Sequence, residues 1–405
     1  MVSPTFVIIG AGLAGAKAAE ALRKKGFDGQ LILLGDEHHR PYERPPLSKD
    51  ILTGKAERES AFVHPQSWYA DHDVDLRLGT QVAGVDRAAH EVVLGDGSRV
   101  GYAKLLLATG AEPRALPGAQ GTLQLRRFGD TERLRQVLES GSRLAVVGAG
   151  WIGLEVAAAA RQAGLEVTVL EALELPLLPA LGPEAARVFA DLHTAHGVDL
   201  RLGVKVAEAS ATHVKLADGT RLDADAVLVG IGAVPNTALA EAAGLLVDNG
   251  IRVDAHLRTS DPDIFAAGDV ANADHPFLRH PIRVEHWANA LKQPAVAAAG
   301  MLGTDEVYDE LPYFYTDQYD LGMEYLGHNE GYDRVVFRGD VEAREFIAFW
   351  LKDGKVVAGM NVNVWDVTDP IKALIRSGTT VDVDRLADPS VPLPEAGTDR
   401  TGTPA

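Results

Sequence analysis

Two stretches of the chain share one arrangement of apolar, glycine and helix-forming residues. Residues 6–9 and 144–147 are short, continuous apolar runs, which are typical of strands buried on both faces. A glycine-rich turn follows each run. Alanine-rich stretches with good helix propensity come next, at 14–25 and 152–163. The pattern therefore predicts a strand, a tight turn and a helix twice in one chain.

The remaining apolar pattern extends both copies into parallel sheets. A second apolar run follows each predicted helix, at 31–34 and 167–170, as expected when a helix crosses between parallel strands. Buried strands are also expected at 104–108 and 263–267. From residue 311 the chain turns to aromatic residues and alternation, which predicts strands at 334–338, 345–351 and 355–364 and a helix at 369–376.

The two turns carry the same glycine spacing. They read Gly10-Ala11-Gly12-Leu13-Ala14-Gly15 and Gly148-Ala149-Gly150-Trp151-Ile152-Gly153. Between a strand and a helix, the first glycine permits the turn, the second lets the backbone approach a pyrophosphate, and the third lets the helix pack on the strand. The free N–H groups of the helix N-terminus then favour the anion. The chain is therefore expected to bind two dinucleotides.

An acidic residue closes the second strand of each copy. Asp36 and Glu171 each lie about 20 residues after the last glycine of their turn, where a carboxylate accepts hydrogen bonds from a ribose diol. Glu171 would repel a 2′-phosphate, and residues 172–176 hold no arginine that could bind one. NADH is therefore expected in preference to NADPH.

Composition narrows the class of protein. With 405 residues, 46% of them hydrophobic, two or three domains are expected. No apolar run reaches the roughly 18 residues of a membrane helix, and the N-terminus lacks the features of a signal peptide, so we expect a cytoplasmic protein. The net charge of −18 argues against nucleic acid and anionic membranes as partners.

The chain contains no cysteine. A redox disulfide, a reactive thiol or a cysteine-bound iron–sulfur cluster within this polypeptide is therefore excluded. Electrons that enter a bound flavin are expected to leave directly to an external acceptor. The histidines at 38, 39, 193 and 196 have no acidic or cysteine partners at ligand spacing, so we interpret them as solvated and predict no metal site. No Gly-x-Ser-x-Gly motif supports a hydrolase.

Further motifs carry a resemblance to a known family. Residues 35–37 and 40–49, with the sequences Gly-Asp-Glu and Arg-Pro-Tyr-Glu-Arg-Pro-Pro-Leu-Ser-Lys, resemble the flavin-binding signature of the oxygenase-coupled ferredoxin reductases of the putidaredoxin reductase type. Matching motifs follow at 107–110, 125–126, 230–232, 267–270, 285–287 and 313–318. The resemblance reaches to about residue 390. It implies an α/β fold with two Rossmann-like dinucleotide-binding domains in a glutathione-reductase-like architecture, plus a small C-terminal α/β domain, with FAD and NADH as cofactors.

The resemblance also implies roles for individual residues. Asp36 would hold the adenosine ribose of FAD, Arg44 and Lys49 would lie along the cofactor, and Val82 would line the adenine pocket. Arg126 would neutralise pyrophosphate charge. Asp269 would bond a ribityl hydroxyl or be a strand-end turn acid, and Trp287 would lie against the isoalloxazine or be a core aromatic. The full expected cofactor-binding set is Gly10, Gly12, Leu13, Ala14, Gly15, Asp36, Arg44, Pro45, Lys49, Val82, Ala108, Thr109, Gly110, Arg126, Gly148, Gly150, Trp151, Ile152, Gly153, Glu155, Glu171, Ile231, Gly232, Asp269, Glu285, His286 and Trp287.

The expected catalytic residues are Lys49 and Glu155. A lysine beside the flavin N5 and C4 oxygen stabilises negative charge on the reduced ring. Glu155, early in the second fingerprint helix, can reach the nicotinamide end of NADH and pairs with the lysine in the family. Its alternative role is stabilisation of the helix dipole, worth about 0.3–1 kcal/mol. Trp151 either gates nicotinamide access or packs, and the sequence leaves both open.

The motifs predict a discontinuous domain organisation. An FAD domain is expected at 1–111 and 237–310, with an NAD domain at 112–236 inserted between crossovers rich in glycine and proline. A C-terminal domain is expected at 311–390, at the dimethylbenzene side of the flavin. Residues 391–405, rich in glycine, threonine and proline, are expected to be a disordered tail.

The expected function is an FAD-containing NADH:ferredoxin reductase that supplies single electrons to a 2Fe–2S ferredoxin, and through it to an oxygenase. A rubredoxin reductase, an NADH oxidase and an apoptosis-inducing-factor-like protein remain as alternatives, although the missing thiol weakens the oxidase. The oligomeric state stays open. Because the ferredoxin is expected to be acidic, docking needs a basic patch near the flavin, for which the candidates are Arg279, Arg283, Arg344, Lys372 and Arg376, around Trp287 and Tyr315.

Overall fold

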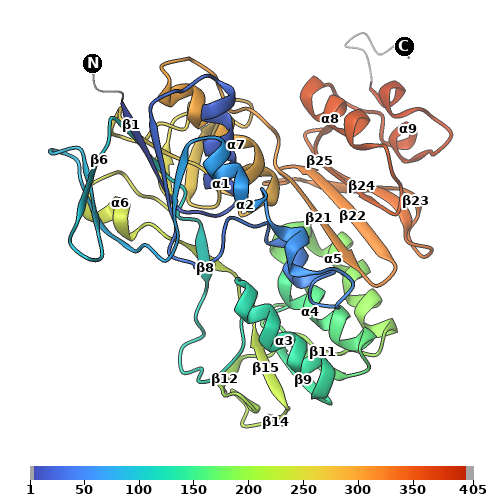
Figure 1. Ribbon diagram of the computed structural model, residues 1–405. Helices are drawn as coiled ribbons and strands as arrows, with labels where there is room; N and C mark the ends of the chain where they lie inside the picture. The colour runs from blue at the N-terminus through green and yellow to red at the C-terminus, as the bar shows by residue number, and fades with distance from the viewer. Residues whose placement is uncertain (1–3, 398–405) are drawn as a thin grey trace. The chain divides into compact units, whose positions relative to one another are not determined.

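The computed structural model describes residues 4–397 (Figure 1). The chain divides into two compact units, and each unit contains three separate stretches of sequence. The first unit holds Met1–Pro45, Glu57–Glu112 and Ala233–Glu310, and the second holds Pro46–Ala56, Pro113–Gly232 and Leu311–Ala405. The segment Pro46–Ala56 thus belongs to the second unit, whereas the expected FAD domain includes it.

A parallel sheet forms the centre of the first unit. Its strand order is β18-β7-β1-β2-β3, which is the order of a doubly wound fold. The strands predicted at 6–9, 31–34, 104–108 and 263–267 are confirmed to within a residue at each end. Helices α1 (Leu13–Lys24) and α7 (Trp287–Met301) pack against each other. The sheet strands are β1 (Thr5–Ile9), β2 (Gln30–Leu34), β3 (Val74–Arg77), β7 (Lys104–Leu107) and β18 (Ile264–Ala266).

Shorter elements complete the first unit. One antiparallel sheet contains β4 (Val82–Asp86), β5 (Glu91–Leu94) and β6 (Arg99–Gly101). A second small sheet contains β17 (Ile251–Val253), β19 (Ala271–His275) and β20 (His280–Ile282). The other elements are β8 (Ala111–Pro113), which pairs with β16 (Ala233–Pro235), the 3-10 helix η2 (Arg58–Ala61), and the helices α2 (Gln66–Asp71) and α6 (Ala238–Ala242).

The second unit repeats the parallel arrangement. Its sheet has the order β11-β10-β9-β15, and all of its pairs are parallel. These strands are β9 (Arg143–Val147), β10 (Glu166–Leu170), β11 (Asp199–Arg201) and β15 (Ala226–Val229). The accompanying elements are α3 (Phe128–Ser140), α4 (Trp151–Gln162), α5 (Leu178–Ala195), the 3-10 helix η1 (Pro45–Ser48), and the antiparallel strands β12 (Val206–Ala209), β13 (His213–Leu216) and β14 (Arg221–Asp223).

Helix α5 has a break near its start. Gly182 takes a left-handed φ of 74°, and Pro183 lacks the N–H that would continue the ladder. The indole of the fully buried Trp350 donates to the Leu181 carbonyl at 2.9 Å, so that carbonyl still has a donor. The helix after the break carries Phe189 and His193 into the core.

The last part of the second unit is a five-stranded antiparallel sheet with the order β21-β22-β25-β24-β23. Helix α8 (Thr368–Ser377) packs against β22 and β25, as Figure 1 shows. The strands and helix predicted for this part are confirmed. The elements are β21 (Tyr313–Gln318), β22 (Leu321–Gly327), β23 (Arg334–Asp340), β24 (Glu345–Lys352), β25 (Lys355–Val362) and α9 (Val383–Ala387).

The end of the chain differs from expectation in part. Residues 391–397 include a 3-10 helix, η3 (Leu393–Ala396), in which Leu393 and Ala396 are buried. The tail expected from residue 391 is therefore ordered up to residue 397, because these apolar side chains pack. Residues 398–405 lie outside the described residues. No helix among the described residues is long and apolar enough to cross a membrane.

Candidate active site

The first glycine turn leaves space at one position only. Gly10 has a φ of +112°, and a Cβ there would meet the Ala108 carbonyl oxygen at 2.1 Å. A Cβ on Gly15 would meet the Gly10 oxygen at 2.0 Å, whereas a Cβ on Gly12 would meet no atom within 4 Å. Gly12 also begins α1 without a side-chain cap, so the first-turn N–H groups face an open cradle. This geometry fits a bound pyrophosphate.

The second turn has the same design. Gly148 has a φ of +100°, and a Cβ there would meet the Gly230 oxygen at 2.4 Å. A Cβ on Gly153 would meet the Gly148 oxygen at 2.2 Å, but one on Gly150 would meet nothing nearer than 3.9 Å. Gly150 begins α4, again without a side-chain cap. Both units therefore offer a cradle suited to one dinucleotide each.

The two acids expected to bind riboses lie after β2 and β10, as the sequence predicts. Asp36 is exposed. Glu171 is half-buried, and its carboxylate accepts hydrogen bonds from the backbone N–H of Ala149 at 2.7 Å and of Leu173 at 2.9 Å. The second carboxylate is thus held against its own glycine turn. Arg201 lies beside it on β11, but the Arg201 side chain pairs with Asp199 at 2.8 Å.

Other expected residues of the first unit are fixed by local bonds. The Thr109 hydroxyl donates to the Asn236 carbonyl and the Asn236 amide donates to the Thr109 carbonyl, both at 2.8 Å, which fixes the end of β7 beside Gly110. Gly268 donates its N–H to Gln293 at 2.8 Å, one residue before Asp269. Leu13, Ala14 and Ala108 are buried, Val82 on β4 is half-buried, and Pro45 lies at the start of η1.

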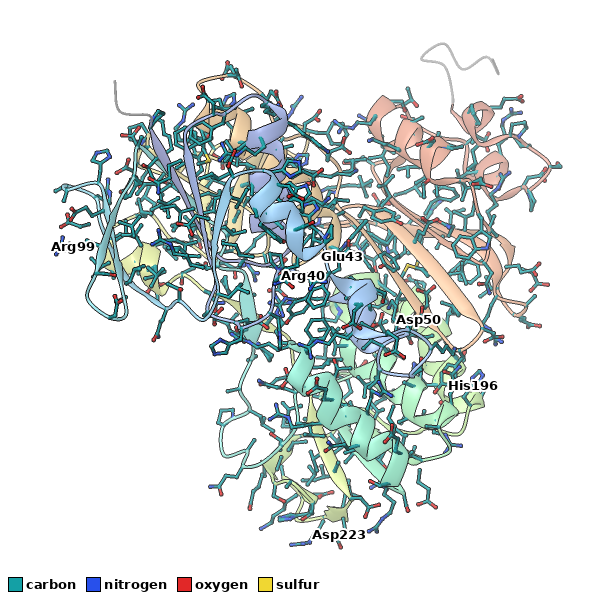
Figure 2. The ribbon with its side chains drawn as sticks, viewed as in Figure 1. Arg40, Glu43, Asp50, Arg99, His196 and Asp223 are labelled. Carbon is teal, nitrogen blue, oxygen red and sulfur yellow. The ribbon has the colours of Figure 1, made fainter. Side chains whose placement is uncertain are left out.

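The signature at 40–49 contacts the start of α7. The Trp287 indole donates to the carboxylate of Glu43, which is labelled in Figure 2, at 2.9 Å. His286 is the N-cap residue of α7. Arg44 pairs with Glu37 at 3.2 Å. Trp287 is half-buried and makes a directed polar contact, which fits a residue of the flavin site better than a core aromatic.

Arg283 does not belong to the exposed cations expected for docking. Its side chain is only 9% exposed, pairs with Glu285 at 2.5 Å, and donates to the Asp269 carbonyl at 3.2 Å. It therefore positions the segment that carries Asp269 and Glu285, and its inclusion among exposed docking cations is wrong. The sequence could not show this burial, because two of the partners, Asp269 and Asn249, lie 14 and 34 residues away in the sequence.

Lys49 and Glu155 form a buried ion pair in the second unit. The Lys49 ammonium contacts Oε1 of Glu155, and the Ser48 hydroxyl donates to Oε2. Side-chain exposure is 15% for Lys49 and 6% for Glu155. The Lys49 ammonium also lies 5.6 Å from the centre of the Tyr315 ring. The expected pairing of these two residues is thus present in the geometry.

A third group completes the carboxylate's surroundings. The Thr316 hydroxyl donates to Oε1 of Glu155 at 2.6 Å. Asp317, the next residue, has its pKa raised by partial burial and by the nearby carboxylates of Glu155 and Asp50, while Lys49 acts in the opposite direction. The site therefore concentrates negative charge around one lysine.

Trp151 packs in this structure. It begins α4 and lies 4.8 Å from the Phe314 ring and 5.6 Å from the Phe189 ring, measured between ring centres. Because residues four apart share a helix face, Trp151 and Glu155 point to the same side of α4. Of the two roles that the sequence leaves open, the contacts favour packing.

The remaining expected residues of the second unit lie at the glycine turn or near it. Ile152 is exposed on the first turn of α4, and the Ile231 side chain borders Gly148. Gly232 accepts a backbone hydrogen bond from Arg114. Arg126 lies just before α3, where its N–H donates to Asp130 at 2.9 Å.

Four residues linked to Glu155 by hydrogen bonds, directly or through one another, were not expected from the sequence to belong to the site. They are Ser48, His193, Thr316 and Gln318, all fully buried polar residues. The expectation of a solvated histidine is wrong for His193, since α5 places it four residues after the buried Phe189, on the same face. Thr316 and Gln318 stood in a motif noted only for its resemblance, and their alternation with Phe314 was the available signal.

Comparison with known proteins gives two family matches. The pyridine nucleotide-disulphide oxidoreductase family model matches residues 4–294, and a reductase C-terminal model matches residues 313–396. The α/β fold class expected from the sequence is confirmed by these matches and by the sheets described above.

Several curated proteins are similar over nearly the whole chain. The ferredoxin–NAD(+) reductase component of the anthranilate 1,2-dioxygenase system from Burkholderia cepacia is 43% identical, over 97% of this chain and 99% of that protein. Putidaredoxin reductase from Pseudomonas putida is 40% identical, over 96% of each. Among solved structures, the covalent putidaredoxin reductase–putidaredoxin complex matches with a TM-score of 0.93 and 38% identity, over 98% of each chain.

Proposed function

We propose that this chain, which belongs to the pyridine nucleotide-disulphide oxidoreductase family, is an NADH:ferredoxin reductase with FAD as its bound cofactor. Its electron acceptor is a 2Fe–2S ferredoxin that serves an oxygenase. The observation that carries the proposal is the buried Lys49–Glu155 pair next to the second glycine cradle, in a chain that is 43% identical to an oxygenase-system ferredoxin reductase over nearly its whole length. A cytoplasmic location is a further part of this proposal.

The chain's own residues bind and position the reactants. The cradles at Gly12 and Gly150 take the two pyrophosphates, and Asp36 and Glu171 take the adenosine riboses. FAD, when bound, supplies the conversion of a two-electron hydride donor into a source of single electrons. Lys49 supplies a fixed positive charge for the reduced ring, which is electrostatic stabilisation by a preorganised group.

Glu155 holds Lys49 in place. Hydrogen bonds between charged groups are shorter and stronger than those between neutral groups. The Glu155 carboxylate makes such a bond with the Lys49 ammonium, and the bond from Ser48 restrains the other carboxylate oxygen. Glu155 therefore determines where the ammonium lies.

The absence of cysteine removes the competing thiol route. The full sequence has no thiol that could accept electrons from a flavin. Reduction of an internal disulfide, and thiol-based peroxide chemistry, are excluded for this chain. An external one-electron acceptor fits the residues present.

The direct test is turnover of the purified protein. We expect a yellow protein with FAD bound non-covalently, and rapid NADH-dependent reduction of a 2Fe–2S ferredoxin. Rubredoxin and dioxygen are the comparison acceptors. Faster reduction of rubredoxin or dioxygen than of any ferredoxin tested would replace the proposal with a rubredoxin reductase or an NADH oxidase. A protein that takes up no FAD would overturn it altogether.

The catalytic pair has its own test. Lys49→Ala and Glu155→Ala should each slow flavin reduction by NADH by about 100-fold, the scale for losing one preorganised electrostatic group, while FAD stays bound. Lys55→Ala, an exposed lysine on the same segment, and Glu139→Ala, an exposed acid on α3, are matched controls. Stopped-flow absorbance gives the rates. Wild-type rates in both site variants would demote the pair to a structural contact.

A further inference from the structure

A line of buried hydrogen bonds leads away from Glu155. The Thr316 hydroxyl contacts Oε1 of Glu155 at 2.6 Å, and the Gln318 amide nitrogen contacts the Thr316 oxygen at 3.1 Å. Nε2 of His193 contacts the Gln318 amide oxygen at 2.8 Å. Exposure is 1% for Thr316 and Gln318 and 0% for His193. All four residues lie in the second unit.

The chemistry of these groups gives every bond one direction. A carboxylate only accepts, so Thr316 donates its hydroxyl proton to Glu155. The Thr316 oxygen then accepts from the amide N–H of Gln318, and the amide oxygen of Gln318 accepts from His193. The histidine must therefore carry its proton on Nε2. Each donor group in the line is directed toward the Glu155 carboxylate, and hydrogen bonds arranged in such a chain polarise one another.

Burial keeps the far end of the line neutral. The apolar surroundings of His193 lower its pKa to about 4, although the contact with Gln318 acts in the opposite direction. The Tyr319 hydroxyl lies 3.5 Å from Nδ1 of His193, and the Tyr319 ring stacks on His196. His196, labelled in Figure 2, is the C-cap residue of α5. The line thus begins near the partly exposed His196 and ends at a buried charge.

Three elements bring the line together by their normal periodicity. Residues 151 and 155 share one face of α4, residues 189 and 193 share one face of α5, and residues 314, 316 and 318 share one face of β21. The aromatic contacts of Trp151 with Phe189 and Phe314 hold these faces together. The polar line therefore runs beside an aromatic cluster that fixes its geometry.

We propose that Thr316, Gln318 and His193 are positioning residues that hold the Glu155 carboxylate in the orientation that serves Lys49 and Ser48. Without the Thr316 hydroxyl, Oε1 keeps only the lysine as a partner, and the carboxylate is held by two contacts instead of three. A buried polar line is costly unless every member is satisfied, and this one is satisfied from Gln318 to Lys49. The inference rests on the proposed role of the pair in flavin reduction.

A double-mutant cycle on the holoenzyme tests the proposal. Thr316→Val removes the hydroxyl at nearly constant volume and should slow flavin reduction by NADH by about tenfold, with little change in NADH affinity. Thr316→Ser should restore the rate to within about twofold of wild type. In a Glu155→Gln background, Thr316→Val should have almost no further effect, because residues that act through one another are non-additive. Thr168→Val, on β10, is the matched control.

Two other readouts do not depend on turnover. Nitrogen NMR of ¹⁵N-histidine-labelled holoenzyme should show His193 as a neutral ring protonated on Nε2, and Gln318→Leu should shift that signal. Urea unfolding of the same four cycle variants should show coupling between Thr316 and Glu155. A His193 ring protonated on Nδ1, or additive effects of Thr316→Val and Glu155→Gln on the reduction rate, would overturn the inference.

The outcomes separate this inference from the proposed function. If the cycle shows coupling in flavin reduction but no ferredoxin is reduced, the positioning role stands and the proposed acceptor is wrong. If ferredoxin is reduced and the cycle is additive in rate, the proposed function stands and the positioning role is wrong. Coupling in urea unfolding alone would show a structural contact without a role in hydride transfer, which also contradicts the inference.

Discussion

Glu155 carries a charge that the fold has almost removed from water. Its two oxygens accept from one ammonium and two hydroxyls, which together compensate for the lost hydration. Removing one partner of a buried ion pair typically costs about 3–5 kcal/mol of stability, since the other charge stays buried. The thermal stability of variants at this pair should therefore be measured before any change in their rates is interpreted.

His193 predicts a pH dependence of stability. Its pKa in the folded protein is lowered by burial from the ordinary 6.5 to about 4, so the unfolded chain binds the proton first as the pH falls. Stability is thus lost between about pH 6.5 and pH 4, by roughly 2 kcal/mol at pH 5 from this residue. His193→Gln should remove that part of the loss.

The measurement is urea unfolding of both proteins at pH 7 and pH 5. The wild-type midpoint should fall more steeply than that of His193→Gln. His196→Gln, a half-buried residue one turn further along α5, is the control and should behave as wild type. Equal slopes for wild type and His193→Gln would show that folding does not lower the pKa of the buried ring.

Glu171 predicts the choice of nucleotide. NADH should exceed NADPH in catalytic efficiency by at least about tenfold, because the carboxylate is held at the glycine turn and would repel a 2′-phosphate. Glu171→Ala combined with Leu173→Arg should relax this preference, since Leu173 is 40% exposed and follows the acid closely. Steady-state kinetics with both nucleotides check the ratio. A wild-type enzyme that prefers NADPH would refute the ribose assignment.

The sequence predicted single residues well where one position determines the role. The glycines at 10, 12 and 15 and the acid at 171 lie as their spacing indicates, because a turn and a strand end are local features. The neighbours of Glu155 could not be predicted, since Thr316 contacts it across 161 residues of sequence. Such contacts depend on packing between elements that no local pattern specifies.

At the level of elements, different glycines of the first turn are needed for cofactor binding and for folding. Gly12→Val should leave the fold intact, because the position is open, but should fill the cradle and weaken FAD binding by at least about tenfold. Gly15→Val should instead impair folding, since even a Cβ overlaps the Gly10 oxygen. Gly129→Val, on the exposed face of α3, is the control for Gly12→Val.

FAD content by absorbance and melting of the apoproteins distinguish these effects. Gly12→Val should yield folded protein with little flavin, and Gly15→Val should yield little folded protein. Full flavin content in Gly12→Val would mean that the pyrophosphate binds elsewhere.

Elements with a strong period were predicted to within a residue or two, and others were missed. The helices α1, α4 and α8 and the parallel strands β1, β2, β7, β9, β10 and β18 follow continuous apolar runs or clear amphipathic spacing. The parallel strands β3, β11 and β15 were not identified. Helices α3, α5 and α7 were not identified. Two of these helices contain a proline, a residue that disfavours a helix interior. Pro183 interrupts α5, and Pro294 lies inside α7, where the helix continues past it. Tertiary packing overrides local preference there.

For the whole molecule, the net charge of −18 requires a local basic surface for an acidic ferredoxin. Two of the expected cations form ion pairs within the protein, Arg283 with Glu285 and Arg344 with Asp320, each at 2.5 Å. Arg279 is exposed, whereas Lys372 and Arg376 on α8 are half-buried. For these three residues a part in docking stays a prediction from the sequence.

The rate of ferredoxin reduction should therefore fall as salt rises from about 0.05 to 0.3 M, while flavin reduction by NADH stays nearly constant. Lys372→Glu combined with Arg376→Glu, both on α8, should raise KM for ferredoxin severalfold at low salt. Arg221→Glu, on β14, makes one of the same charge changes and is the control. An unaltered KM in the double variant would place the docking surface elsewhere.

The membership of Pro46–Ala56 in the second unit has a consequence for how the chain is assembled. Lys49 is made early in synthesis, but its partner Glu155 follows 106 residues later, and Thr316 later still. Closing loops of that length is entropically costly until the intervening elements have formed. The pair should thus be among the last features to form. A fragment limited to Pro113–Gly232 would keep its glycine turn yet lack both the lysine and the threonine, so transplanting that fragment alone would transfer a nucleotide site without its electrostatic partner.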